Sequence, residues 1–454
     1  MKLASFLRAS MAATGLLVLA ACGGGGGDDD GSSTPPPGSS TYQIGGSVSG
    51  LSGSGLVLAN GSSTVDVASG ATSFNFADRL AGGASYAVTV QAQPAGQTCM
   101  VSNGSGTVGS ADVTSIAVSC RAYVAYVTKL GPDALDQFSL DANGGFAALA
   151  PASVSTGLDP RDIVITPDGR FAYTANAESS SISQFGVGTS GALSALSTAA
   201  VDTDQGPTDL AISPDGKALY SVNFTSNNVR QYSIGADGQL TAMSPSRANT
   251  GNGPSSIAIT PDGKFAYVAN FLSGSITVFD VGSNGQLTAR ANTVSLGAGS
   301  GPRELVVSPD GKALYVTLNN QNAVAQFSIG SDGALAAIGS SGTIAAGTQP
   351  YGITITRDGK FVYVANFAGN SVTQYSVGTN GQLSLLSPAS VATAGATPHG
   401  LAVSPDGKWL YVTSLGAPGA LVTQYSIGAN GTLAVVDDIA LSSAVASPWS
   451  IVVH

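Results

Sequence analysis

The sequence predicts an all-β protein in which a small β-sandwich is followed by a seven-bladed β-propeller. Three observations predict this fold class: a turn recurs every 47 or 48 residues, short apolar runs end at Gly, Pro or Ser, and no segment has the helical period. The repeated turn centres on an aspartate, and these aspartates are Asp168, Asp215, Asp262, Asp310, Asp358 and Asp406.

A tyrosine lies five residues after each of these aspartates, and Tyr126 occupies the same position one period earlier. Seven units therefore fill residues 122–454 at about 48 residues each, which suits a four-stranded blade. In one unit, 209–213, 218–223 and 229–234 are predicted strands, and Pro214-Asp215-Gly216 turns the chain between the first two.

The end of the chain indicates how the ring closes. The first unit begins at its second strand, 123–128, whereas residues 448–454 have the pattern of a first strand with no unit after them. We therefore expect this strand to complete the first blade and leave no open edge. A solenoid is the structural alternative, but it would need polar caps at both ends.

Residues 1–21 have the pattern of an export signal, in which Lys2 and Arg8 precede a short apolar core. Leu19-Ala20-Ala21-Cys22 resembles the bacterial lipobox, which implies cleavage before Cys22 and lipid modification of that cysteine. An ordinary signal peptide with an incidental cysteine is the alternative. Residues 22–41 are predicted to form a flexible tether of Gly, Asp, Ser and Pro. Gly23 resembles the residue that directs such lipoproteins to the outer membrane, so the expected location is the cell envelope, on either its periplasmic or its surface side.

Residues 42–121 contain short alternating runs typical of a β-sandwich. They also hold the other two cysteines, Cys99 and Cys120, which we expect to form a disulfide because exported proteins rarely leave thiols free. Two buried free thiols are the alternative. The segment GGSVSGLSGSGLVLANG resembles a glycine-rich module near the start of envelope lipoproteins, and we interpret it as a spacer or adhesive module.

Composition limits the partners. The chain has 454 residues, with 17 Lys and Arg against 27 Asp and Glu, and a formal net charge of -10. So acidic a chain cannot neutralise phosphates, which excludes nucleic-acid binding. The expected partners are a small molecule, a glycan or an envelope protein, and the membrane through the lipid anchor.

The candidate site lies where the innermost strands of the blades begin, because propellers collect variable side chains at that mouth of the channel. The residues seven before each turn aspartate, together with Trp449, are expected to line it: Arg161, Thr208, Ser255, Arg303, Tyr351, His399 and Trp449. We predict that five of them bind ligand: Arg161, Arg303, Tyr351, His399 and Trp449. The alternative for the two arginines is an ion pair with Asp162 or Glu304. The asparagines that recur opposite this position are interpreted as structural caps: Asn176, Asn223, Asn270 and Asn366.

The segments SPDGKALYV and TPDGKFAYVAN resemble those of YVTN-type propellers and, more closely, of the seven-bladed lactonase propellers related to 6-phosphogluconolactonase and the muconate cycloisomerases. Pro302-Arg303-Glu304 matches a Pro-Arg-His segment of these enzymes, with Glu304 in place of the histidine, and their acidic residue corresponds to Asn319. If the protein is a lactonase, the resemblance implies catalytic roles for Arg303, Glu304 and His399. In a regular strand, however, Arg303 and Glu304 would point to opposite faces.

Because the base of the family is replaced, the sequence favours a non-catalytic binding or scaffold propeller in the envelope. A lactone hydrolase or cycloisomerase is the alternative. The sequence contains no Ser-His-Asp order, Cys-His pair, phosphate loop or zinc spacing, so we expect neither a cofactor nor a metal.

Overall fold

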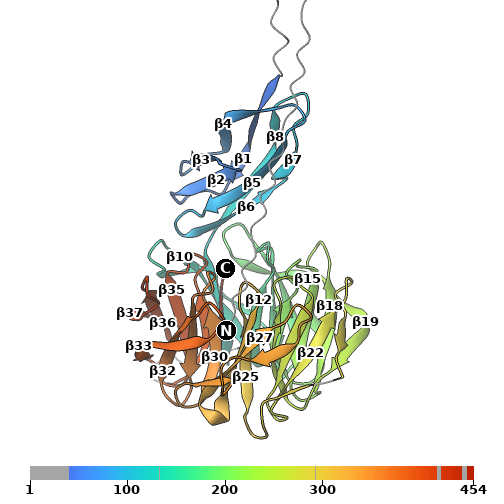
Figure 1. Cartoon of the computed structure of the whole chain (residues 1–454), viewed down its shortest axis with the longest axis vertical. Helices are drawn as coiled ribbons and strands as arrows, with labels where there is room; N and C mark the ends of the chain where they lie inside the picture. Colours follow the sequence, from blue (N-terminus) through green and yellow to red (C-terminus); the bar gives the residue numbers. More distant parts are fainter. Residues whose placement is uncertain (1–39, 132, 292, 417–420, 442–446) are drawn as a thin grey trace, which may run out of the picture. The chain divides into compact units, whose positions relative to one another are not determined.

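The computed structural model describes residues 40–131, 133–291, 293–416, 421–441 and 447–454. The predicted export signal, Cys22 and nearly all of the predicted tether lie outside these residues. The fold is all-β, with a two-sheet sandwich and seven blades, as the sequence predicts (Figure 1). Five blades have four strands, and in blades 4 and 5 the outer strand is divided into two short strands. The described residues contain one short 3-10 helix, Asn319–Gln321, and no helix long and apolar enough to cross a membrane.

The sandwich packs two sheets face to face. One sheet has the order β4 (Ser73–Ala81), β1 (Thr41–Ser49), β8 (Val113–Ala122) and β6 (Gln97–Ser102). The other has the order β3 (Ser63–Val67), β2 (Leu56–Asn60), β5 (Ser85–Ala92) and β7 (Ser105–Thr107).

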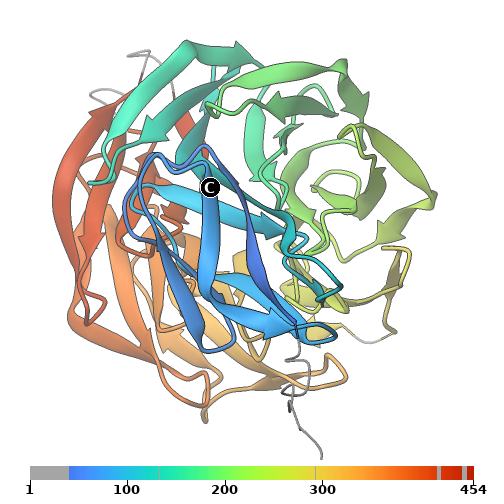
Figure 2. The same cartoon turned by 90° about the horizontal axis from the view of Figure 1, so that it is seen from above.

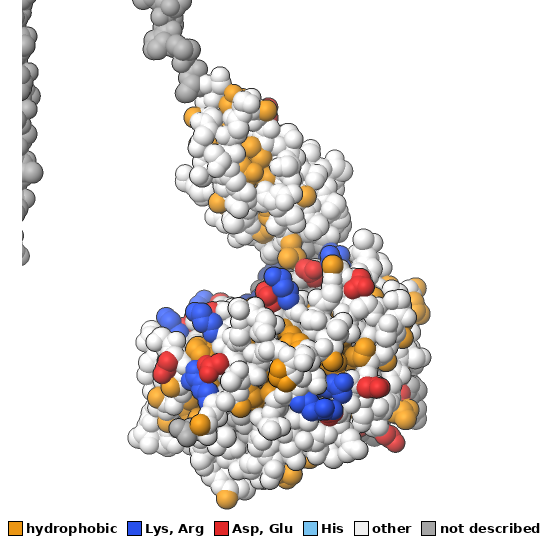
Figure 3. All heavy atoms as spheres, turned by 90° about the vertical axis from the view of Figure 1, so that its right-hand side faces the viewer, with side chains coloured by type: hydrophobic (Ala, Val, Ile, Leu, Met, Phe, Trp, Pro, Cys, Tyr) orange, Lys and Arg blue, Asp and Glu red, His pale blue; other side chains and the backbone are white. Residues whose placement is uncertain are grey.

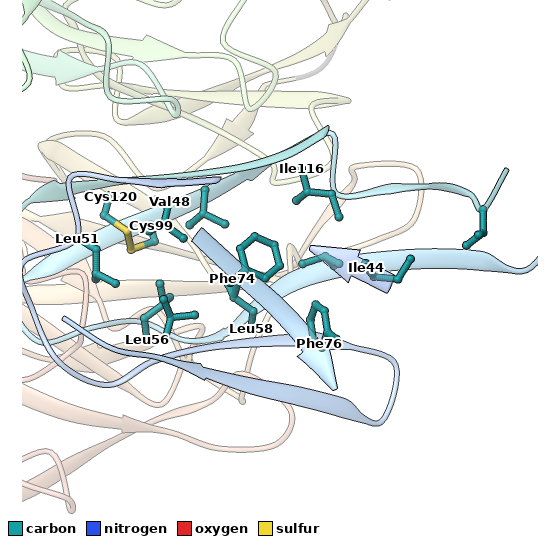
Figure 4. Close-up of a cluster of buried hydrophobic side chains, with 14 residues drawn as sticks. Ile44, Val48, Leu51, Leu56, Leu58, Phe74, Phe76, Cys99, Ile116 and Cys120 are labelled. Carbon is teal, nitrogen blue, oxygen red and sulfur yellow. A yellow bond between two sulfur atoms is a disulfide. The ribbon is translucent and has the colours of Figure 1, made fainter. Parts of the chain in front are cut away.

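Alternation along these strands buries one face of each sheet. In β4, Phe74 and Phe76 are buried between exposed neighbours, and their rings meet edge to face (Figure 4). Cys99 on β6 lies directly opposite Cys120 on β8, and the two form a disulfide, which confirms the predicted pairing. The bond closes a segment of 21 residues at one side of this apolar core.

Each blade is an antiparallel sheet that runs from an inner strand to an outer one, and the blades form a ring (Figure 2). Blade 1 holds β38 (Ser447–Val453), β9 (Val124–Leu130), β10 (Ala134–Leu140) and β11 (Phe146–Ser155). Blade 2 holds β12 (Pro160–Ile165), β13 (Phe171–Asn176), β14 (Ser181–Val187) and β15 (Leu193–Asp202). Blade 3 holds β16 (Pro207–Ile212), β17 (Ala218–Asn223), β18 (Asn228–Ile234) and β19 (Leu240–Asn249).

The remaining four blades repeat this order. Blade 4 holds β20 (Pro254–Ile259), β21 (Phe265–Asn270), β22 (Ser275–Val281), β23 (Leu287–Ala289) and β24 (Val294–Ser295). Blade 5 holds β25 (Pro302–Val307), β26 (Ala313–Leu318), β27 (Ala323–Ile329), β28 (Leu335–Ala337) and β29 (Thr343–Ala345). Blade 6 holds β30 (Pro350–Ile355), β31 (Phe361–Asn366), β32 (Ser371–Val377) and β33 (Leu383–Ala392), and blade 7 holds β34 (Pro398–Val403), β35 (Trp409–Ser414), β36 (Leu421–Ile427) and β37 (Leu433–Ala440).

The repeated tyrosines connect neighbouring blades. All seven are fully buried, and each hydroxyl donates to a glycine carbonyl in the turn before the outer strand of the next blade, at O–O distances from 2.5 to 2.9 Å. Tyr411 of blade 7 reaches Gly144 of blade 1, so the series closes on itself. A buried hydroxyl must be hydrogen-bonded, and each such bond contributes about 1 kcal/mol. The repeated tyrosine therefore fixes how each blade docks on the next.

The closing strand β38 pairs antiparallel with β9, with Pro448 opposite Lys129 and Ile451 opposite Val127. The first blade thus combines strands from both ends of the propeller. On the face that Figure 3 shows, charged side chains are sparse and most of the surface is uncharged.

Candidate functional site

Every inner strand has a proline at its start, as the first residue in six blades and the second in β38, and then contains a β-bulge. In β25, Pro302 lies opposite Leu318 and Leu305 lies opposite Val316, so Arg303 and Glu304 share the single partner Thr317. The same shift in register occurs in the other six inner strands. An extra residue in one strand bends it and re-aims its side chains. The bulges therefore lie where the inner strands open onto the channel.

A cavity of about 580 Å³ occupies this mouth. All seven residues that the turn spacing places at the strand starts line it: Arg161, Thr208, Ser255, Arg303, Tyr351, His399 and Trp449. The five predicted ligand-binding residues are thus brought together in one cavity. A volume of this size suits a small-molecule ligand.

These five side chains form a continuous arc around the cavity. The His399 ring lies between Tyr351 and Trp449, with centroids 3.8 and 3.7 Å away. Arg303 covers the Tyr351 ring at 4.9 Å, and Arg161 covers the Trp449 ring at 4.1 Å. Each arginine is held over an aromatic face by cation–π attraction. The arc therefore has a guanidinium at each end and aromatic surface between them.

The two arginines differ in their charge balance. Arg161 Nε lies 2.8 Å from a carboxylate oxygen of Asp159, so Asp159, and not Asp162, is its ion-pair partner. Arg303 contacts the Phe271 ring at 3.7 Å, and within the described ranges no carboxylate lies within ion-pairing distance of it. Its Nε is buried without a hydrogen-bond partner, and burial lowers the pKa of its guanidinium. Arg303 is therefore a buried cation with an unsatisfied donor in the cavity wall.

His399 is held neutral. Its side chain is 4% exposed, and burial, reinforced by the charges of Arg161 and Arg303, lowers its pKa well below 6.5. Nδ1 lies 3.1 Å from the Trp449 carbonyl oxygen, which only accepts, so Nδ1 carries the proton. Nε2 is then an acceptor, and it is buried with no partner among the described residues.

Glu304 lies in the same cavity as Arg303, so the expectation that they face opposite ways is wrong. The alternation rule assumes a regular strand, whereas the bulge in β25 allows both side chains to line the cavity. Burial, followed by the charge of Asp162, raises the pKa of Glu304 to about 8, while a hydrogen bond from the Ile353 amide opposes this rise. Glu304 is therefore a carboxyl group whose proton comes off near neutral to mildly basic pH.

Two further acidic residues line the cavity, and sequence reasoning missed them as site residues. The carboxyl groups of Asp162 and Asp209 hydrogen-bond to each other, which requires one of them to be protonated. Burial raises the pKa of both, and the charge of Asp162 raises that of Asp209 further. A signal for them existed: Asp162, Asp209 and Glu304 each interrupt an apolar strand at the same position of their units.

The acidic side chains also connect adjacent blades. Asp162 accepts the Leu210 amide at 3.0 Å, and Asp209 accepts the Ile257 amide at 2.7 Å. Each of these amides lies just after the bulge of its strand, so a carboxyl group of one blade bonds the backbone of the next. The acidic groups therefore have a structural role as well as a place in the cavity wall.

The recurring asparagines are structural, as predicted. Asn270 donates to Ser275 and Thr277 and accepts from the Gly251 amide, all within its own blade, and Asn366 repeats these contacts in blade 6. Asn319, at the family's acidic position, lines the cavity and donates to the Pro350 carbonyl at 3.1 Å. Among the described residues, no group of three or more His, Cys, Asp or Glu side chains is arranged to hold a metal ion.

Comparison with solved structures gives propellers of the same fold. A candidate 6-phosphogluconolactonase of Bacteroides uniformis is 22% identical with a TM-score of 0.63, and the match covers 73% of this chain and 99% of that one. The periplasmic gluconolactonase of Pseudomonas aeruginosa is 21% identical with a TM-score of 0.61, and covers 73% of this chain and 98% of its own. At such identities the likeness shows the fold. No curated protein matches the chain.

The family model described as "Lactonase, 7-bladed beta-propeller" matches residues 86–289 and 283–446. The match begins within β5 of the sandwich and extends through the fourth strand of blade 7. Together the two segments span well over half of the chain. With its seven blades and its closed ring of inner strands, the chain belongs to the seven-bladed lactonase β-propeller family.

Proposed function

We propose that the protein is a lactone hydrolase whose reaction takes place in the cavity at the strand-start mouth. The observation that carries the proposal is the juxtaposition in one strand of Arg303, a buried cation without a carboxylate partner, and Glu304, a carboxyl group with a pKa of about 8. The sequence lacked the family's histidine at this position, and Glu304 supplies a base in its place. Membership of the lactonase family supports this alternative over a binding module alone.

The reaction needs a donor for the carbonyl oxygen and a base for water. The Arg303 guanidinium donates to the lactone carbonyl and stabilises the negative charge that forms there. The Glu304 carboxylate removes a proton from water as its oxygen attacks the carbonyl carbon. The bond between that carbon and the ring oxygen then breaks, and the proton held by Glu304 passes to the ring oxygen, which gives an open hydroxy acid.

His399 has a different role in this scheme. It is a neutral imidazole with Nδ1 bonded to the Trp449 carbonyl and its ring stacked between Tyr351 and Trp449, so it positions these two rings in the cavity wall. Its low pKa makes it a weak base, so we assign proton removal to Glu304.

The test is acid release from a panel of γ- and δ-lactones by the purified protein, followed between pH 6 and pH 10. We expect kcat/KM to rise with pH through about 8, as Glu304 loses its proton. Arg303→Ala and Glu304→Gln should each lower kcat/KM at least a hundredfold. The matched control is Glu178→Gln, which changes the other of the two glutamates in the sequence, an exposed one. Failure of the folded protein to open any lactone would favour the binding-module alternative, whereas full activity in both variants would refute the roles assigned to Arg303 and Glu304.

A further inference from the structure

The positions four residues after the repeated tyrosines form a mostly apolar rim around the mouth; Leu130 is the last residue of β9, and the other six directly follow the second strands of their blades. Six of the seven residues are apolar: Leu130, Ala177, Phe224, Phe271, Asn319, Phe367 and Leu415, in chain order. Ala177, Phe224, Asn319 and Phe367 line the cavity, and Phe271 packs on Arg303. We call the phenylalanines Phe224, Phe271 and Phe367 the aromatic rim.

The fold does not require aromatic side chains at the rim. The amide of Phe224 donates to the Gly206 carbonyl at 2.8 Å, and the Phe271 and Phe367 amides make the equivalent bond. Ala177 and Asn319 make it too, at 2.8 and 3.0 Å. A methyl group and a polar amide thus occupy the same backbone position without disturbing it. Something other than backbone geometry must account for the three phenylalanines.

These rings are also only half-buried. Phe224 and Phe271 contact each other with centroids 6.4 Å apart, and Phe367 contacts Tyr351 at 6.2 Å. The next residue after Phe271, Leu272, is 61% exposed, and Leu158, in the loop before β12, is 50% exposed. These are two of only six large hydrophobic side chains that are strongly exposed in the described part of the chain. Apolar surface at the mouth of a cavity marks a binding site.

The floor and the rim therefore have different chemistry. The floor is the arc formed by Arg161, Trp449, His399, Tyr351 and Arg303, which has a guanidinium at each end and aromatic surface between them. A ligand in the cavity can bond its carbonyl oxygen to a guanidinium of the floor and stack on the rings there, while the rim offers it only apolar contact. From this division we infer that the site takes an amphiphilic lactone, with its ring on the floor and an alkyl or acyl chain against the aromatic rim. The inference rests on the proposed function for the lactone ring, but the rim itself is independent of catalysis.

Binding can be tested without turnover by using lactams, which keep the ring and the carbonyl but resist hydrolysis. The probes are γ-lactams with a methyl, propyl, pentyl or heptyl group on the ring carbon next to nitrogen, titrated calorimetrically into the full chain. Each methylene that is buried against the rim should lower Kd about fourfold, until the alkyl group is long enough to extend beyond the rim. A Kd that does not change from methyl to heptyl would overturn the inference.

The matched variants are Phe224→Asn and Phe367→Asn, because Asn319 shows that this backbone position accepts asparagine. Each should raise Kd for the heptyl lactam at least tenfold while changing Kd for the methyl lactam less than twofold. Leu385→Asn, at an exposed leucine on the outer strand β33, is the control and should change neither. Equal losses for both probes in the rim variants would instead indicate a structural role for these rings.

The same series of lactones separates the two proposals. Chain-dependent lactam binding without lactone turnover would refute hydrolysis and leave the amphiphilic site in place. Turnover with a kcat/KM that does not depend on the length of the alkyl group, or that is highest for a polyhydroxylated lactone, would support hydrolysis. It would refute the inference that the substrate carries an apolar chain.

Discussion

Replacing Glu304 by glutamine should make the propeller less sensitive to basic pH. Glutamine keeps an oxygen that can accept the Ile353 amide but has no proton to lose. In the folded protein the pKa of Glu304 is about 8, against 4.5 for an exposed glutamate, because burial disfavours the charged form. Between pH 4.5 and about pH 8, Glu304 is therefore protonated in the folded protein but ionised in the unfolded protein. The contribution of Glu304 to the free energy of unfolding is therefore largest below pH 4.5, and it decreases as the pH rises towards 8.

The size of the effect follows from these two values. At about 1.36 kcal/mol per pH unit, most of the penalty of about 5 kcal/mol develops between pH 5 and pH 9. The free energy of unfolding of the wild type should thus fall by about 4 kcal/mol more than that of Glu304→Gln over this range. Asp162 and Asp209 are present in both proteins. The difference between the two pH dependences therefore reports the titration of Glu304, including its interaction with these two aspartates.

Urea unfolding followed by tryptophan fluorescence is the suitable assay. Both tryptophans of the chain, Trp409 and Trp449, lie in propeller strands, so the signal does not report on the sandwich. Glu178→Gln should follow the wild-type pH dependence. If Glu304→Gln and the wild type lose stability in parallel from pH 5 to pH 9, Glu304 is ionised throughout, and the proposed base with a pKa near 8 is wrong.

Three other predictions concern the rest of the chain. Replacing both Cys99 and Cys120 by serine should destabilise the sandwich by about 3 kcal/mol, seen by calorimetry, and leave the fluorescence transition of the propeller in place; a shift of that transition would mean that the two modules unfold together. Asn270→Ala removes three buried hydrogen bonds and should lower propeller stability by about 2 to 3 kcal/mol in urea, whereas Asn284→Ala at an exposed turn should change it by less than 0.5 kcal/mol. Cys22→Ser should move the protein from the membrane fraction to the soluble fraction, and mass spectrometry of the wild type should find a diacylated or triacylated N-terminal peptide; an unmodified peptide that begins elsewhere would contradict the predicted anchor.

The sequence predicted the members of the cavity wall well because a repeat carries its register from blade to blade. Once the turn aspartate is fixed, the position seven residues earlier falls at the strand start in every unit, and Arg303 and His399 were found in this way. The disulfide followed from the number of cysteines. The first inference depends only on the distance in sequence from the turn, which the repeat keeps constant, and the second only on the number of cysteines.

Asp162 and Asp209 were missed as residues of the cavity wall, and Glu304 was expected on the wrong face, for one physical reason. A period of two along a strand assigns Glu304 to the face opposite Arg303, and a bulge breaks that period without any residue type that announces it. The ion pair of Arg161 with Asp159 depends on the loop before the strand, whose path the repeat does not determine. The stacking of His399 between two rings depends on how closely seven blades approach, which no single unit encodes.

The pairing of β38 with β9 has a consequence for the order in which the molecule assembles. Blades 2 to 7 each form from one continuous stretch of chain, so they can begin to fold during or soon after synthesis. The first blade must wait, because Pro448 and its partner Lys129 are 319 residues apart along the chain. Joining ends so distant has an entropic cost on the order of 5 kcal/mol when the intervening chain is flexible, and far less once six blades already hold it in an arc. Until then β9 presents an unpaired edge that another strand can occupy, so the slow and vulnerable interval of folding is the one just before the ring shuts.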